Sequence, residues 1–77
     1  MYTEEMRKAV HSIIPPKNFG INIVDNENFL TIKLNEYDFI SMVHDEKIKA
    51  VQYVAKIKEV LELNGAIVLV TREVVKQ

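Results

Sequence analysis

The chain has 77 residues, a formal net charge of −1 and no cysteine. A chain of this length supports one hydrophobic core and buries only about 60% of its unfolded surface, so we expect a single domain, residues 1–77. The lack of cysteine excludes disulfides and thiolate metal sites, and it fits a reducing compartment. The balanced charge disfavours nucleic acid as a partner, because polyanion binding needs a surplus of positive charge.

The sequence also disfavours a membrane partner. The longest apolar run, residues 66–70, is far shorter than the about 20 residues that a membrane-spanning helix needs. The first ten residues carry Glu4 and Glu5, where a secretion signal has a basic and then an apolar region. We therefore expect a cytoplasmic protein.

Residues 3–14 are predicted to form a helix. Thr3 is a typical N-cap residue, and the two glutamates that follow oppose the positive end of the helix dipole. Apolar residues recur at helical spacing on one side, namely Met6, Val10 and Ile13. Pro15 and Pro16 are expected to end the helix, because proline lacks an amide proton and restricts the residue before it.

Residues 19–24 and 29–34 are predicted to form a β-hairpin around the turn residues 25–28. The expected register pairs apolar residues on one face: Ile23 with Leu30, Ile21 with Ile32, and Phe19 with Leu34. The opposite face then carries Val24 and Phe29 near the turn and polar residues elsewhere. This sorting is typical of a hairpin with one buried face.

Residues 36–43 are compatible with two structures. Asn35 followed by Asp38 is compatible with the start of a helix. The β-branched and aromatic content and the short length fit a third strand. We favour the strand, because two helices about 10 Å across cover four strands spaced about 4.8 Å apart.

Residues 45–63 are predicted to form a long amphipathic helix, with Asp45 as its N-cap and Gly65 in the left-handed position that ends it. One narrow stripe carries the expected core residues Ala50, Val54, Ile57 and Leu61. We also expect the aromatic residues Tyr37, Phe39 and Tyr53 to belong to the core.

The last predicted strand covers residues 66–71, and Val74 and Val75 are compatible with an extension of it. Residues 66–70 are apolar on both faces, which is typical of a strand inside a sheet. The expected fold is therefore α+β in the order α-β-β-β-α-β, with two helices on a small mixed sheet and the C-terminal strand in an inner position.

No motif in the sequence indicates catalysis, so we predict no catalytic, cofactor-binding or metal-binding residues. His11 and His44 lack the convergent partners that a general base or a metal site needs. The chain has only two glycines and neither a P-loop nor a dinucleotide-binding pattern.

Several apolar or amphipathic residues are expected to remain at the surface after the core is filled. The candidate partner-binding residues are Val24, Phe29, Ile48, Val51, Ala55 and Lys58. Because small domains often gain stability by self-association, we expect a homodimer that buries part of this set.

The sequence favours a small non-enzymatic protein-interaction module: a regulator, adaptor or inhibitor of the size common among phage and mobile-element proteins. The alternative is a nucleic-acid-binding domain that uses a helix face carrying Lys49 and Lys56, which are seven residues apart. An enzyme, or a structural or assembly subunit, is less favoured. The protein partner itself is unknown.

Overall fold

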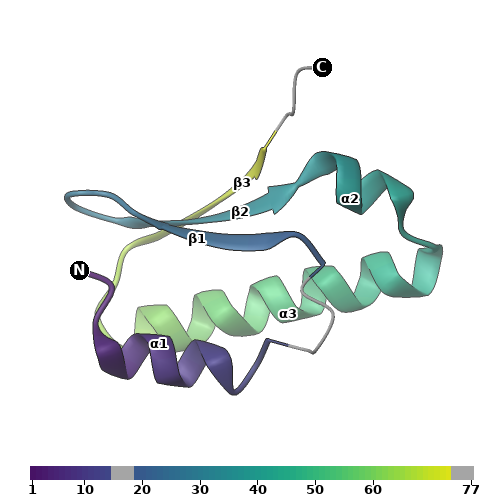
Figure 1. The fold of residues 1–77 in the computed structure, drawn as a ribbon. Helices are drawn as coiled ribbons and strands as arrows, with labels where there is room; N and C mark the ends of the chain where they lie inside the picture. The colour runs from purple at the N-terminus through teal and green to yellow at the C-terminus, as the bar shows by residue number, and fades with distance from the viewer. Residues whose placement is uncertain (15–18, 74–77) are drawn as a thin grey trace.

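The computed structural model describes residues 1–14 and 19–73. Its elements in chain order are α1 (Glu4–His11), β1 (Ile21–Asp25), β2 (Leu30–Asn35), α2 (Glu36–Ser41), α3 (His44–Leu63) and β3 (Val68–Glu73). The strands form one sheet in the order β1-β2-β3, in which β2 pairs antiparallel with β1 and parallel with β3. Figure 1 shows α1 and α3 together on one side of this sheet. The described chain is an α+β fold with two helices on a small mixed sheet, as predicted.

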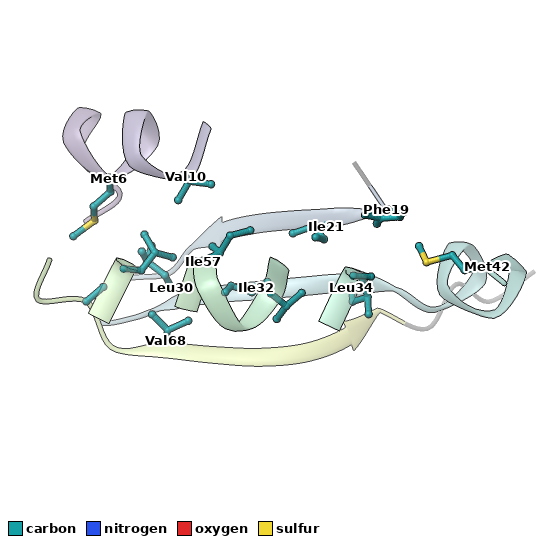
Figure 2. Close-up of a cluster of buried hydrophobic side chains, with 14 residues drawn as sticks. Met6, Val10, Phe19, Ile21, Leu30, Ile32, Leu34, Met42, Ile57 and Val68 are labelled. Carbon is teal, nitrogen blue, oxygen red and sulfur yellow. The ribbon is translucent and has the colours of Figure 1, made fainter. Parts of the chain in front are cut away.

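The core lies between the sheet and these two helices (Figure 2). Its fully buried large side chains include Leu30 and Ile32 of β2 and Ile57 and Leu61 of α3. The predicted stripe of α3 is confirmed, since its four residues are all buried. Burying one large aliphatic side chain contributes about 1.5–3 kcal/mol, so this layer is the main source of stability.

Helix α1 begins where the sequence predicts. The Thr3 hydroxyl accepts a hydrogen bond from the Met6 backbone N–H at 3.2 Å, which is the expected N-cap contact. Met6 and Val10 are buried against the core, and Ile13 is half-buried beside them. The helix ends at His11, and the predicted stop at Pro15 and Pro16 lies outside the described residues.

The hairpin forms, but its predicted register is wrong by two residues. Ile23 faces Ile32, and Ile21 faces Leu34. The first strand continues through Asp25, and a tighter loop follows in which the Asn26 backbone N–H donates to the Phe29 carbonyl at 2.9 Å. Because side chains alternate with a period of two, this slip leaves every residue on its predicted face.

The predicted third strand at residues 36–43 is wrong, because this segment contains the helix α2. The Asn35 side-chain oxygen accepts the Asp38 backbone N–H at 3.2 Å and caps the helix. The place beside β2 that a third strand would take is occupied by β3. None of the six α2 residues is buried, and Tyr37 is exposed rather than in the core.

Helix α3 begins one residue earlier than predicted, at His44. Its N-cap is Val43, which makes no side-chain cap bond, so the prediction of Asp45 as the cap is wrong. Asp45 lies in the first turn instead, where its charge still opposes the helix dipole.

The C-terminal end of α3 confirms the predicted role of Gly65. Gly65 has φ +89, and its backbone N–H donates to the Glu62 carbonyl at 3.0 Å. The Ala66 backbone N–H donates to the Leu61 carbonyl at 3.1 Å, which completes a Schellman motif. This closure turns the chain directly from α3 into β3.

The C-terminal strand β3 is confirmed as a strand, but its predicted inner position is wrong. Among the described residues it pairs only with β2, and it forms one edge of the sheet. The reason is the change in residues 36–43: without a strand there, the described chain offers no second neighbour for β3. The possible extension at Val74 and Val75 lies outside the described residues.

An added side chain is expected to lower the free energy of unfolding by different amounts at the two glycines. Gly20 has φ +69, and a Cβ there meets the Asn35 Cβ at 3.0 Å and the Asp38 Cβ at 3.1 Å, whereas Gly65 has nothing within 4 Å. Gly65→Ala should lower the free energy of unfolding by about 1 kcal/mol from backbone strain alone. Gly20→Ala should lower it by about 2 kcal/mol or more, because α2 must also move. Urea denaturation of both variants checks this, and equal losses would contradict the close approach of Gly20 to α2.

We expect the Asp25 carboxylate to stabilise the fold in a pH-dependent way. The N-terminal ammonium donates to it at 2.7 Å and the Tyr2 backbone N–H at 2.9 Å, which holds the pKa of Asp25 below its usual range. The Asp25 carboxyl then binds a proton more readily in the unfolded state than in the folded state. Its contribution to the free energy of unfolding is therefore fully present above the ordinary aspartate pKa of about 4 and is lost as the pH falls through the lowered pKa of the folded state. Asp25→Asn should therefore be less stable than the wild type at about pH 7, and the difference should shrink at about pH 3. Urea denaturation at the two pH values measures it, and a difference independent of pH would refute this role.

Candidate protein-interaction surface

The face of the sheet opposite α1 and α3 carries an apolar patch. The observed register places Val24 and Leu69 on this face, at the end of the sheet nearest the β1–β2 turn. Phe29 and Ile67 come directly before β2 and β3, and continuing the strand alternation by one residue places them on the same face. We call these four residues the far-face patch. Ile67 and Leu69 are 65% and 48% exposed, and Val24 and Phe29 are half-buried. Figure 1 shows no described helix over this face of the sheet.

One polar side chain is buried within the far-face patch. Thr31 lies between Val24 and Leu69 across the three strands, and its hydroxyl accepts a hydrogen bond from the Asn26 side-chain amide at 2.9 Å. This hydrogen bond gives the buried Thr31 hydroxyl a partner and links the β1–β2 turn to the patch. The rest of the face is polar, because Asn22, Lys33 and Thr71 align across the strands.

A groove of about 260 Å³ runs between α3 and the free edge of the sheet. It is lined mainly by Leu34, Phe39, Val51, Val54, Val70 and Arg72. We call it the α3–β3 groove. Val51 and Val70 face it from its two sides and are 54% and 47% exposed, so a large part of its apolar lining is open to solvent.

Positive charge gathers at one end of the α3–β3 groove. The Lys47 ammonium lies 5.6 Å and the Arg72 guanidinium 5.3 Å from the centroid of the Phe39 ring. Among the described residues, neither cation forms a salt bridge. Further along α3, Lys58 is neutralised by Glu62 at 2.8 Å. The Phe39 end of the groove therefore offers the Lys47 and Arg72 cations to an anionic group from outside the described chain.

The structure divides the predicted partner-binding residues between two surfaces. Val24 and Phe29 belong to the far-face patch. The other predicted residues lie on one side of α3, where Ile48, Val51 and Ala55 are exposed and Lys58 is half-buried. Sequence reasoning therefore grouped residues that belong to two different sides of the molecule.

Sequence reasoning missed the contributions of β3 to both surfaces. Ile67 and Leu69 complete the far-face patch, and Val70 and Arg72 complete the groove. The sequence predicts Ile67, Leu69 and Val70 in an inner strand over residues 66–71, where they would be covered, and that predicted strand ends before Arg72. The available signal was the ambiguity of residues 36–43, because a helix there removes the strand that was expected as the second neighbour of β3.

The described titratable groups do not form an obvious chemical centre. His11 ends α1 and His44 begins α3, and both are exposed. In the described parts of the chain, no three histidine, aspartate or glutamate side chains gather as metal ligands. A shallow hollow beside α1 contains Tyr2, whose pKa is raised by burial although Arg7, 4.8 Å from its ring, opposes the shift.

The alternative nucleic-acid surface remains a prediction. Lys49 and Lys56 are exposed on α3, and Glu59 follows on the same side of the helix. The aromatic residue of α3, Tyr53, is four residues after Lys49, but it is half-buried and packs against Phe19, with ring centroids 6.1 Å apart.

Comparisons with protein families, curated proteins and solved structures gave no match to this chain. Over residues 1–14 and 19–73, no helix combines the length and apolar character needed to cross a membrane.

The exposure of the groove predicts unequal effects of two neighbouring valines. Val54 is 8% exposed and Val51 is 54% exposed, although both line the α3–β3 groove. In dilute protein, Val54→Ala should lower the free energy of unfolding by about 2 kcal/mol, because it removes two buried methyl groups and leaves a cavity. Val51→Ala should change it by less than about 0.5 kcal/mol. Thermal and urea denaturation measure both, and a comparable loss at Val51 would show that the groove is closed.

Proposed function

We propose that this chain is a small non-enzymatic protein-interaction module, acting as a regulator, adaptor or inhibitor that docks another protein on its far-face patch. The observation that carries the proposal is the exposure of Ile67 and Leu69 beside Val24 and Phe29, on a face that no described helix covers. Contiguous apolar patches with polar surroundings are typical of protein-interaction sites. The cysteine-free sequence supports a cytoplasmic setting.

The geometry of the patch supports a protein partner over a small molecule. The patch lies on an open sheet surface, whereas small-molecule sites are concave and enclose most of the ligand. Its half-buried aromatic residue, Phe29, is of the type enriched at the centres of protein interfaces. The polar row formed by Asn22, Lys33 and Thr71 provides a rim on one side.

The proposal predicts that one substitution in the patch abolishes partner capture. Ile67→Lys places a charge in the patch at a position that is already 65% exposed, so the fold should tolerate it. Leu63→Lys is the matched control, since Leu63 is 79% exposed near the end of α3 and lies outside the patch. Immobilised wild type and control should retain the same protein from a lysate of the source organism, and Ile67→Lys should lose it.

The captured protein is then purified and its affinity measured by calorimetry. The expected result is a dissociation constant at least about tenfold weaker for Ile67→Lys than for Leu63→Lys, because a charge buried in an apolar interface costs more than 1.4 kcal/mol. Equal affinity of the two variants, or no protein retained by the wild type, would contradict docking on the far-face patch.

A further inference from the structure

Within residues 1–14 and 19–73, the outer edge of β3 presents backbone groups without a partner strand. The Leu30 backbone N–H donates to the Ile67 carbonyl at 2.8 Å, and Leu30 and Ile32 are the register partners of Val68 and Val70. In a parallel ladder this register directs the backbone groups of Ile67, Leu69 and Thr71 toward β2. The N–H and C=O groups of Val68, Val70 and Arg72 therefore point away from the sheet.

Over its first three residues, this edge lacks the features that usually keep strand edges apart, and the charged residues of β3, Arg72 and Glu73, lie at its C-terminal end. Natural edge strands carry lysine, proline or a bulge, or are covered by another element. The first three residues of β3 are Val68, Leu69 and Val70, and their pairing with β2 is regular. An apolar, regular, unpaired edge is a template for another strand.

We propose that a second copy of this chain covers the edge. Two β3 strands pair antiparallel around a two-fold axis perpendicular to the sheet, and the two three-stranded sheets become one sheet of six strands. The axis passes Val70, so that Val70 faces Val70 of the partner subunit and Arg72 faces Val68 of the partner subunit. This inference concerns the β3 edge and the α3–β3 groove and goes beyond docking on the far-face patch.

The choice of this register follows from the strand itself. With Val70 on the axis, the residues whose backbone groups point outward, Val68, Val70 and Arg72, each face a residue of the second copy whose backbone groups also point outward. An antiparallel ladder requires this pairing. It also overlaps residues 68–72 of the two strands, which are five of the six residues of β3. A shift that places Arg72 on the axis would bring two guanidinium groups face to face, which is unfavourable.

The α3–β3 groove explains how the side chains fit such a dimer. Val70 and Val51 are half-exposed on the side of the sheet that carries α3. A β3 strand from a second copy lies next to this opening and brings a second Val70 and Val51 into it. Ile48 and Ala55 lie beside Val51 on the surface of α3. In the dimer they face α3 of the second copy. A two-fold interface uses one surface patch twice, so the same residues close both grooves.

The charges along α3 complement one another under the same two-fold axis. Lys47 and Arg72 lie at the Phe39 end of the groove, and Glu62 lies on the same side of α3, 15 residues after Lys47. The axis reverses the direction of α3 in the second copy. Glu62 of the partner subunit is thereby brought to the end where Lys47 and Arg72 have no carboxylate partner among the described residues.

The size of the contact indicates a reversible dimer. A standard interface buries about 800 Å² per partner, which is about 15% of the 5386 Å² surface of this chain. One strand edge and one side of α3 supply fewer residues than the about 20–30 of a standard interface. We therefore expect dissociation in the micromolar range, with monomer and dimer both present over accessible concentrations.

Sedimentation equilibrium up to about 1 mM chain tests the dimer directly. The wild type should approach twice the mass of one chain, and Leu63→Lys should behave in the same way. Val70→Pro should be a folded monomer, because it removes an outward N–H and leaves the β2–β3 hydrogen bonds intact. Val70→Lys gives a second edge variant if the proline disturbs folding. A wild type that stays monomeric at about 1 mM, or edge variants that still dimerise, would overturn the proposal.

A charge-reversal series tests the orientation of the two copies. Lys47→Glu and Glu62→Lys should each weaken dimerisation several-fold, because each places like charges together across the axis. The double variant should dimerise more tightly than either single variant, since the charges across the axis are then only exchanged, although Glu62→Lys also removes the contact with Lys58 within each copy. Absence of this rescue, in variants whose circular dichroism matches the wild type, would reject the antiparallel arrangement of α3.

Single cysteines introduced into this cysteine-free chain test the register. Facing residues of a hydrogen-bonded antiparallel pair lie about 5.5 Å apart between Cα atoms, within the range that a disulfide spans. Val70→Cys should form a covalent dimer on mild oxidation at least about tenfold faster than Leu63→Cys or Thr71→Cys. Fastest cross-linking of Thr71→Cys would contradict the proposed axis. The far-face patch is intact in all these variants, so failure of the dimer leaves partner capture separately measurable.

Discussion

The fold depends on the burial of β2 between two strands and beneath α3. Leu30 and Ile32 of β2 are completely buried, and they meet Ile57 and Leu61 of α3, which are also completely buried. The backbone of β2 is held at the same time by an antiparallel neighbour and a parallel neighbour. Met6 and Val10 of α1, Ile21 of β1 and Val68 of β3 are buried in the same core cluster as this strand and this helix.

The helices cover the sheet unevenly. The two flanks of α3 have different environments: Tyr53 packs against Phe19, just before β1, and Val51 faces β3 across the open groove. In Figure 2, Met6 and Val10 of α1 lie on the β1 side of the core. Helix α1 therefore covers the β1 side of the sheet, and the β3 side is the less covered half of the molecule. This uneven cover leaves the α3–β3 groove open, whereas the far-face patch is open because no described helix lies on that face of the sheet.

The parts of the fold that sequence predicted depend on local rules. Helical spacing is local, and so the core stripe of α3 was identified in full. The Thr3 cap and the Gly65 turn were predicted because each depends on backbone geometry within a few residues. The hairpin register and the identity of α2 depend on competition between distant segments, such as β3 and residues 36–43 for the place beside β2. A single sequence does not show which competitor wins.

The same distinction explains the candidate surfaces and the apolar segment at residues 66–70. Exposure of Val51 could be predicted from its angle on α3, whereas exposure of Val70 depends on strand order. A strand apolar on both faces normally has cover on both faces, and here the described chain buries only Ala66 and Val68 of this segment. An inner-strand sequence at a sheet edge is physically consistent if the missing neighbour comes from another chain. A second copy at the edge and a partner on the far face would together give β3 the surroundings that its composition predicts.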